Sequence, residues 1–486
     1  MPYAFLTAWT AMVLLLPVVA RDIAALADVS NIVFTPGRTE SELNFAWQTY
    51  GGSSADASLQ VVLKSEMTGA DFPEDKAQTF AGKSADFGNG LTSHKATATG
   101  LAPSTSFLYR LGTGQPGVWS DVYEFSTRDR EVYSVILVGD PQIGDRRIDD
   151  DTDGWRDTMD KALRKAPDAA FVLSVGDLVK SASSQEQYDG LLSISQFRIL
   201  PFVPTIGNHD DNILFSYHFN IPNENLHSGK TEAGGNYYFV YGNSLFIVIN
   251  SNSLNYNQHK TFIRGVVKKH RQTRWKIVLM HHSIYGADLA RSRTLDLKES
   301  LVPVFDKYGI DAVLAGHDHI YARSRFMRDD SVVPPLEEFP ARLTPPSEIP
   351  DGAVIKPEGV LYLTASSSSG SKYYDPPRQF FDYLAERSAP YVPMFSRVNI
   401  TNTSFEIVTF KTDDMAVIDS FVMVKAAVKD AQPQSVFTVT LAIGVVFCIV
   451  LAFIRRKRRG GKVKASSKNP WVHGRAARVP SKKRDF

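Results

Sequence analysis

The sequence predicts an all-β sandwich followed by a larger α/β domain, and three observations lead to this prediction. Residues 28–128 alternate apolar and polar side chains in short runs, as antiparallel strands with one buried face do. Residues 131–425 contain continuous Val, Ile and Leu runs between helical segments, which is typical of strands covered on both faces. Hydrophobic residues make up 43% of the 486 residues and charged residues 22%, so a disordered or fibrous chain is excluded.

The predicted sandwich has clear strand faces. Leu43, Phe45 and Trp47 share one face of a strand, and alternate positions in 107–111 share another. Turn residues at 50–53 and 114–117 separate such strands. This segment of about 100 residues is long enough for a β-sandwich and carries no obvious chemistry.

The predicted α/β domain repeats one unit, an apolar strand that ends in polar residues. We expect helices at 153–165, 185–198, 257–271 and 296–308. The proline-rich stretch 329–356 predicts a long surface loop, and 359–426 predicts strands that complete a second sheet. Ligands of open α/β sheets bind outside the carboxyl ends of the strands, so the polar strand ends predict a site there.

The residues at these strand ends could hold metal ions. Cys448 is the only cysteine, so no intramolecular disulfide and no cysteine-ligated zinc site can form. Any metal must therefore use Asp, His, Asn or Gln. The candidates are Asp140, Gln142, Asp177, Asn208, His209, His281, His317 and His319.

These residues occur in a specific series of motifs: GD-P-Q, GD, GNHD, MHH and GHDH. Over about 131–425 the series closely resembles the calcineurin-like metallophosphoesterase superfamily. The segments 99–112 and 119–127 resemble the fibronectin type III module that precedes purple acid phosphatase catalytic domains. The resemblance implies an α/β (α+β) four-layer sandwich after the fibronectin III-like domain. It also implies that phosphate esters are hydrolysed by a metal-activated hydroxide.

The resemblance further implies two divalent metal ions and assigns their ligands. One ion is assigned to Asp140, Gln142, Asp177 and His319. The other is assigned to Asp177, Asn208, His281 and His317, so that Asp177 bridges the two. Oxygen and imidazole ligands suit Mn²⁺, Zn²⁺ or Fe²⁺.

The same resemblance gives roles to the neighbouring residues. His209 matches the family residue that protonates the leaving oxygen, with a supporting imidazole as the alternative. Similarity to the LMH segment of purple acid phosphatases favours His281 over His282 as the ligand. Alternation in the GHDH turn makes Asp318 structural.

Two positions depart from the family pattern. Gln142 stands where the superfamily usually has a histidine, so we expect weaker binding of the first metal. Lys180 stands where purple acid phosphatases carry a tyrosinate ligand, so we expect neither an Fe³⁺ site nor its colour.

Three functions are compatible with these residues. The first is an acid phosphatase-like phosphomonoesterase, and the second is a phosphodiesterase acting on nucleotide or lipid-linked phosphate. The third, from another class, is a catalytically silent adhesion or receptor ectodomain that uses the sandwich. Loss of Asp177 or of a GHDH histidine would indicate the silent protein, and the sequence keeps all of them.

An acidic segment at 149–160 has the spacing of an EF-hand loop, with Asp149, Asp151, Asp153 and Gly154 in register. Asp160 replaces the final Glu, and no helix is predicted before the segment. We therefore favour an acidic loop whose aspartates lie at the amino end of the helix near 153, with calcium binding as the alternative.

Both ends of the chain predict a single-pass type I membrane protein of the secretory pathway. Residues 1–20 are typical of a signal peptide, and 436–454 are 19 uncharged residues, roughly 28 Å of helix. A buried core helix is the alternative for 436–454. The tail 455–486 holds 13 Lys and Arg against one acid, which predicts a cytosolic tail and places the catalytic domain in the lumen or outside the cell.

The tail and two sequons predict the partners and the cellular location of the protein. Anionic lipids are the expected partner of the tail, and nucleic acid is not expected. Asn399 and Asn402 begin N-glycosylation sequons, which fit a lumenal or extracellular glycoprotein. Residues 482–484 resemble a dibasic ER-retrieval signal imperfectly, and the compartment stays open between ER, endolysosome and plasma membrane.

Overall fold

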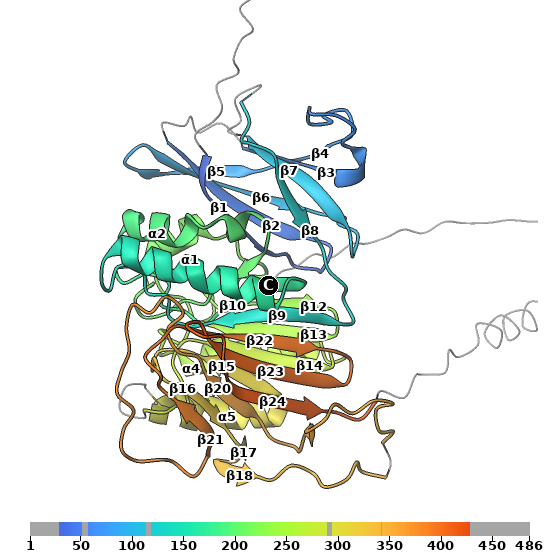
Figure 1. Cartoon of the computed structure of the whole chain (residues 1–486), viewed down its shortest axis with the longest axis vertical. Coiled ribbons are helices and arrows are strands. Elements are labelled where there is room, and N and C mark those ends of the chain that lie inside the picture. The colour runs from blue at the N-terminus through green and yellow to red at the C-terminus, as the bar shows by residue number, and fades with distance from the viewer. Residues whose placement is uncertain (1–28, 51–56, 113–117, 289–293, 342, 428–486) are drawn as a thin grey trace, which may run out of the picture. The chain divides into compact units, whose positions relative to one another are not determined.

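A computed structural model describes most of the body of the chain (Figure 1). The described residues are 29–50, 57–112, 118–288, 294–341 and 343–427. The predicted signal peptide at 1–20, transmembrane helix at 436–454 and tail at 455–486 lie outside these ranges. Within them, no helix has both the length and the apolar character needed to cross a membrane.

The first domain consists of two antiparallel four-stranded sheets, ordered β1-β2-β6-β5 and β4-β3-β7-β8. Phe45 and Trp47 of β2 point into its core together with Tyr109 of β7, as their alternation predicts. A short 3₁₀ turn, η1 (Lys64–Glu66), follows β3. The strands are β1 (Val29–Pro36), β2 (Leu43–Tyr50), β3 (Ser58–Leu63), β4 (Gln78–Ala81), β5 (Lys83–Gly88), β6 (Leu91–Ala98), β7 (Ser106–Gly112) and β8 (Tyr123–Ser126).

The second domain is built on two seven-stranded sheets. The first has the order β11-β10-β9-β22-β23-β24-β19. Its strands are β9 (Tyr133–Val138), β10 (Ala169–Ser174), β11 (Phe202–Val203), β19 (Val354–Ile355), β22 (Met394–Ile400), β23 (Ser404–Lys411) and β24 (Val417–Val424).

The second sheet of this domain has the order β12-β13-β14-β15-β20-β16-β21, with β13, β14, β15 and β20 parallel. A separate hairpin pairs β17 (Phe326–Arg328) with β18 (Ser331–Val333). The strands of the sheet are β12 (Tyr237–Tyr241), β13 (Ser244–Ile249), β14 (Trp275–Met280), β15 (Ala312–Ala315), β16 (Tyr321–Ser324), β20 (Leu361–Thr364) and β21 (Leu384–Ser388).

Side-chain alternation stacks these sheets and the helices into four layers. Val135 of β9 points between the two sheets, whereas its neighbour Ile136 packs against Trp155 of α1. In the other sheet, Ile277 points between the sheets and Val278 packs with α4 and α5. Figure 1 shows α1 and α2 along the side of β9 and β10. The helices are α1 (Ile148–Lys165), α2 (Gln185–Leu192), α3 (Ile213–His218), α4 (Tyr256–Lys269) and α5 (Thr294–Tyr308), with a 3₁₀ turn η2 (Ser195–Arg198).

Two expectations need correction. The strands in 359–426 do not complete one sheet: β20 lies in the middle of one, while β22, β23 and β24 extend the other. The acidic segment 149–160 is not a loop, because α1 already begins at Ile148. The Asp151 carboxylate accepts hydrogen bonds from the backbone N–H groups of Gly144 and Arg146, both at 3.0 Å, so it caps this turn rather than forming part of an EF-hand loop.

The sandwich contacts the α/β domain through its β1-β2-β6 sheet. Lys95 donates to the carbonyl of Phe219 at 2.7 Å, and Ser93 donates to that of Tyr217 at 2.6 Å. Gln48 Nε2 lies 3.0 Å from Nδ1 of the buried His218. Side chains of one domain thus satisfy backbone carbonyls of the other, which holds α3 and the chain after it in place.

Candidate metal centre

The predicted ligands lie in loops that leave the carboxyl ends of strands from both sheets. Asp140 follows β9, Asp177 follows β10, and Asn208 comes after β11. From the other sheet, His281 follows β14 directly and His317 follows β15. Because the two sheets face each other, these loops meet at one edge.

Five of these side chains stand on backbone in the left-handed region, which non-glycine residues rarely adopt. The φ angles are +43° at Asp140, +41° at Gln142, +51° at Asp177, +73° at His317 and +52° at His319. Each such residue costs about 1–3 kcal/mol and persists only where surrounding contacts enforce it. Strain concentrated in one set of loops is typical of a functional site.

Two glycines allow the loops to approach so closely. A Cβ on Gly207 would lie 2.2 Å from Asp177 Oδ1, and one on Gly316 would lie 2.5 Å from Asp140 Oδ2. Any side chain at these positions would displace a carboxylate. The glycines of the GNHD and GHDH motifs are thus steric requirements of the cluster.

One group of donor atoms surrounds the His281 ring. Its Nε2 lies 3.2 Å from Asp177 Oδ1, 3.1 Å from Asn208 Oδ1 and 3.1 Å from His317 Nδ1. Asp177, His281 and His317 each offer a ligand atom within 4.8 Å of the others. His282, the alternative ligand, turns its Nδ1 to Ser251 Oγ at 2.9 Å.

A second group shares Asp177 with the first. Asp140, Asp177 and His319 also have ligand atoms within 4.8 Å of one another, and His319 Nε2 lies 3.6 Å from Asp140 Oδ1. Gln142 follows in the same loop, where its backbone N–H donates to Asp177 O at 2.8 Å. Its buried Oε1 has no hydrogen-bond partner among the described residues.

The hydrogen-bonding pattern fits a cation in each group. His281 Nδ1 donates to Val175 O at 2.9 Å, which leaves Nε2 as the nitrogen that can offer a lone pair to a cation. Nε2 faces a carboxylate oxygen, an amide oxygen and Nδ1 of His317, all of which can serve as metal ligands. His319 is held in the same way, by Lys372 O at 2.9 Å from its Nδ1. Carbonyl-oriented imidazoles of this kind are characteristic of metal ligands.

The charges of the buried side chains support the same conclusion. Burial raises the pKa of Asp140 well above its usual range. Burial also lowers the pKa of His281, but the charge and hydrogen bond of Asp177 outweigh it and raise that pKa to about 10. The buried carboxylates therefore stabilise positive charge within the cluster, and bound cations would supply that charge.

His209 lies beside the shared carboxylate of Asp177 without belonging to either group. Its backbone N–H donates to Asp177 Oδ1 at 2.9 Å, and its ring Nδ1 donates to Lys180 O at 2.8 Å. The half-buried ring thus has one fixed nitrogen and one, Nε2, that can carry a proton.

Sequence reasoning missed the residues that hold the ligand loops. Asp210 is fully buried, and its carboxylate accepts from the backbone N–H groups of Leu178 and Gly207, both at 2.8 Å. Ser366 and Ser367 donate to the carbonyls of His319 and Asp140. The run of four serines after β20 was the signal that could have found this support. Asp318 is structural as predicted, since Ser283 Oγ donates to it at 2.9 Å.

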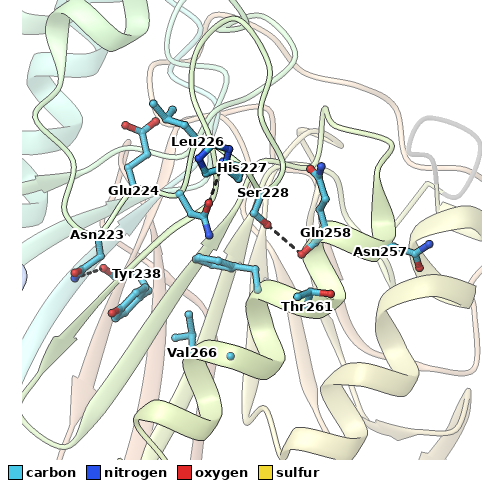
Figure 2. A pocket seen from close by; sticks show the side chains of 13 residues that line it. Asn223, Glu224, Leu226, His227, Ser228, Tyr238, Asn257, Gln258, Thr261 and Val266 are labelled. Atoms are coloured by element: carbon cyan, nitrogen blue, oxygen red, sulfur yellow. Dashed lines mark hydrogen bonds between the residues drawn. The ribbon is translucent and has the colours of Figure 1, made fainter. Parts of the chain in front are cut away.

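A separate hollow of about 980 Å³ lies between the 223–228 loop and α4 (Figure 2). Tyr238, Phe262 and Val266 line it together with Glu224 and Gln258. None of the predicted ligands lines this hollow. The hollow is large, but it shares no lining residue with the predicted metal ligands, so its size gives no reason to assign it to the metal centre.

Comparison with known proteins identifies both domains. Residues 133–321 match the calcineurin-like phosphoesterase family, and residues 29–127 match the purple acid phosphatase N-terminal domain. The chain thus carries a calcineurin-like metallophosphoesterase domain. In front of it stands the N-terminal domain found in purple acid phosphatases, so both parts of the predicted resemblance are confirmed.

Individual relatives match part of this chain at low identity. Purple acid phosphatase 1 of Ipomoea batatas is 28% identical over 254 residues, 48% of this chain and 51% of the relative. Probable inactive purple acid phosphatase 24 of Arabidopsis thaliana is 24% identical over 267 residues, 48% of this chain and 43% of the relative. Across the curated relatives, the matched region spans between about a third and a half of the relative's own length.

Among solved structures, the purple acid phosphatase PPD1 from yellow lupin (Lupinus luteus) seeds is similar in fold. It superimposes with a TM-score of 0.64 over 82% of this chain and 75% of its own, at 16% identity. The mixed α/β metallophosphoesterase fold with an N-terminal β domain is therefore confirmed.

Proposed function

We propose that this protein is a phosphoesterase that works with two divalent metal ions and acts as an acid phosphatase-like phosphomonoesterase. One observation carries the proposal: two groups of Asp and His side chains, all buried except the partly buried His317, share the single carboxylate of Asp177. A carboxylate shared in this way can hold two cations about 3.5–4 Å apart, the spacing of dinuclear hydrolases.

The two groups support the ligand assignment made from the sequence. Asp140, Gln142, Asp177 and His319 would hold one ion, and Asp177, Asn208, His281 and His317 would hold the other. Two such ions, when bound, polarise phosphoryl oxygens and make water acidic enough to act as a nucleophile near neutral pH. The orphaned Oε1 of Gln142 supports its place as a ligand, because a buried acceptor without a partner is otherwise unfavourable.

The proposed role of His209 is to protonate the oxygen of the leaving group. The bond from Nδ1 to Lys180 O fixes the ring plane and leaves Nε2 as the atom that delivers the proton. Because the backbone of His209 is bonded to Asp177, the ring keeps a constant position relative to the bridging ligand. A phosphodiesterase would need the same residues, and the choice between monoester and diester belongs to the experiment below.

The decisive experiment is hydrolysis by the full chain of a panel of phosphate monoesters and diesters, with Mn²⁺, Zn²⁺ or Fe²⁺ supplied separately. We expect metal-dependent hydrolysis with a preference for monoesters, and two ions per chain by elemental analysis. A preference for diesters would replace the monoesterase by the phosphodiesterase. Two bound ions without hydrolysis of any ester would favour the silent ectodomain instead.

We further propose that the protein is a type I membrane protein with this domain in the lumen or outside the cell. The charge distribution of the sequence supports this, since the basic residues follow the apolar segment 436–454. Asn402 is exposed in the turn between β22 and β23, whereas Asn399 lies within β22 and donates to Glu406. Glycosylation at Asn402, abolished in Asn402→Gln and kept in Asn399→Gln, would support the topology. A chain from secretory membranes without any glycan, and with its body open to protease from the cytosolic side, would contradict it.

A further inference from the structure

Helix α4 belongs to a strongly basic stretch of an otherwise acidic body. Residues 233–287 contain seven Lys and Arg and no Asp or Glu, whereas residues 1–454 as a whole hold 41 Lys and Arg against 51 Asp and Glu. Four of the seven cations are exposed in the last two turns of α4 and just after it. These four, called here the basic end of α4, are Arg264, Lys268, Lys269 and Arg271.

The positive charge of the basic end is not balanced within the chain. Lys269 Nζ donates to Tyr238 Oη at 2.7 Å, but among the described residues no carboxylate forms a salt bridge with any of the four cations. The helix dipole favours cations in the last turn, which accounts for Lys268 and Lys269. It does not account for Arg264, which stands four residues before Lys268, where like charges repel each other. A helix that keeps this repulsion without any acid suits a partner that brings negative charge.

The basic end lies beside the point where the chain leaves the body. Lys425 Nζ donates to the carbonyl of Arg274 at 2.7 Å, and the Arg274 guanidinium donates to the carbonyl of Ala426. These bonds hold the turn between α4 and β14 against the residues that follow β24. Eight residues, 428–435, come before the apolar segment 436–454, and at about 3.5 Å per residue they reach at most about 30 Å. The predicted membrane segment is therefore tethered close to the basic end.

We propose that the basic end of α4 is a docking surface for the anionic headgroups of the bilayer in which segment 436–454 is anchored. This inference rests on the proposed type I topology. Exposed cations are attracted to an anionic lipid surface only within about one Debye length, roughly 8 Å at physiological salt. The short tether keeps the basic end near enough to the bilayer to make this contact.

Docking through the basic end would fix the direction in which the metal centre faces. Strand β14 begins at Trp275, beside the basic end, and ends at Met280, directly before His281. Six residues of strand span roughly 20 Å, so the basic end and the centre lie at opposite edges of the sheet. The bilayer would then cover the edge that carries no ligands and leave the centre open to water-soluble phosphate esters.

The test measures how closely the basic end of the full chain approaches the bilayer. The chain is reconstituted in nanodiscs of phosphatidylcholine, with or without phosphatidylserine. A donor dye is placed at Gln272→Cys in a Cys448→Ser background, since Gln272 is exposed beside Arg271, and an acceptor dye is placed on lipid headgroups. We expect phosphatidylserine to increase energy transfer and high salt to reverse the increase, because salt screens exposed charges.

Charge variants show whether the basic end causes this response. In the triple variant Arg264→Gln/Lys268→Gln/Arg271→Gln, the ratio of docked to undocked molecules should fall about fivefold for each charge removed. The variant Arg264→Lys/Lys268→Arg/Arg271→Lys keeps the charges and should keep the response, which separates loss of charge from a defect in folding. The matched control, which should also keep the response, removes three exposed lysines of the sandwich: Lys64→Gln, Lys76→Gln and Lys83→Gln.

The outcomes separate the docking surface from the membrane anchor. Equal energy transfer with both lipid compositions, or an undiminished response in the triple Gln variant, would overturn the docking surface. Retention on heparin that depends on the basic end, in a chain that does not respond to phosphatidylserine, would also overturn it, because the partner would then be an anionic polysaccharide. A chain that stays outside the nanodiscs would refute the anchor instead, and energy transfer to phosphatidylserine vesicles would then test the basic end by itself.

Discussion

Two buried histidines of this chain show how different neighbours give the same side chain opposite roles. His281 in the metal centre and His218 beneath the sandwich are both almost completely buried. Burial lowers the pKa of each ring, and at His218 it does so to about 3, helped by the charge of Lys95. At His281 the Asp177 carboxylate outweighs burial and raises the pKa to about 10.

The partners of the two rings explain the difference. His218 stacks on Tyr188 with ring centroids 4.2 Å apart and lies 3.0 Å from the uncharged Gln48 amide. His281 lies against a carboxylate, an amide oxygen and a second imidazole. At His218, burial and the nearby charge of Lys95 both disfavour protonation, so the ring stays neutral and packs between the domains. The electron-rich atoms around His281 make it part of a site that favours cations.

The largest effect should come from Asp177, the carboxylate that lies against His281 and has no counterpart beside His218. Asp177→Asn removes the charge shared by both ligand groups, so we expect no measurable turnover and a clear loss of bound metal. Elemental analysis and hydrolysis of phenyl phosphate measure both. Asp157→Asn on α1 serves as the control. Two ions per chain together with full turnover in Asp177→Asn would contradict the shared site.

Removal of His209 should separate catalysis from metal binding. We expect His209→Ala to keep both ions and to lose about 10²- to 10⁴-fold in kcat, the usual contribution of a general acid. The loss should be larger for phenyl phosphate than for p-nitrophenyl phosphate, because the better leaving group needs less protonation. If metal content fell as far as in Asp177→Asn, His209 would be a ligand rather than an acid.

The domain interface should make folding sensitive to acid through His218. Its pKa is about 3 in the folded chain and about 6.5 when unfolded, so the unfolded chain binds the proton first as pH falls. Stability from this group is complete above pH 6.5 and is lost as pH falls toward 3, by about 2 kcal/mol at pH 5. Denaturant unfolding at pH 7.5 and pH 5 should show a smaller acid loss in His218→Leu than in the wild type. The exposed His227 provides the control, and an equal effect of His227→Leu would argue against the interface as the cause.

The smallest effect should come from Gln142, the amide proposed as a metal ligand. Replacing the neutral oxygen in Gln142→His by an imidazole should tighten metal binding, and Gln142→Leu should weaken it, because the ligand atom is then lost. Competition with a chelator followed by elemental analysis gives the order of the three proteins. Identical retention of metal in all three would show that Gln142 is not a ligand.

The sequence predicted most of the catalytic scaffold because its signals are local. The buried strands, the four principal helices and the motifs at the strand ends follow from apolar runs and from residue types at fixed spacing. The start of α1 was predicted five residues too late, because capping by Asp151 depends on the loop of Gly144 and Arg146 folding back onto the helix. The distribution of β20 and β22–β24 over two sheets was also mispredicted, since strand pairing is decided by contacts far apart in the chain.

The sequence by itself determined the residue types and order of the centre: the GD, GNHD and GHDH motifs, with Gly207 and Gly316 where loops pass close to a carboxylate. Only the tertiary structure decided which atoms meet. It placed His281 rather than His282 against Asp177, and it brought Asp145, Lys180 and Lys372 together from three separate loops. The physical reason is that spacing along a chain fixes which residues share a strand or helix, whereas the packing of two sheets fixes which loop ends face one another.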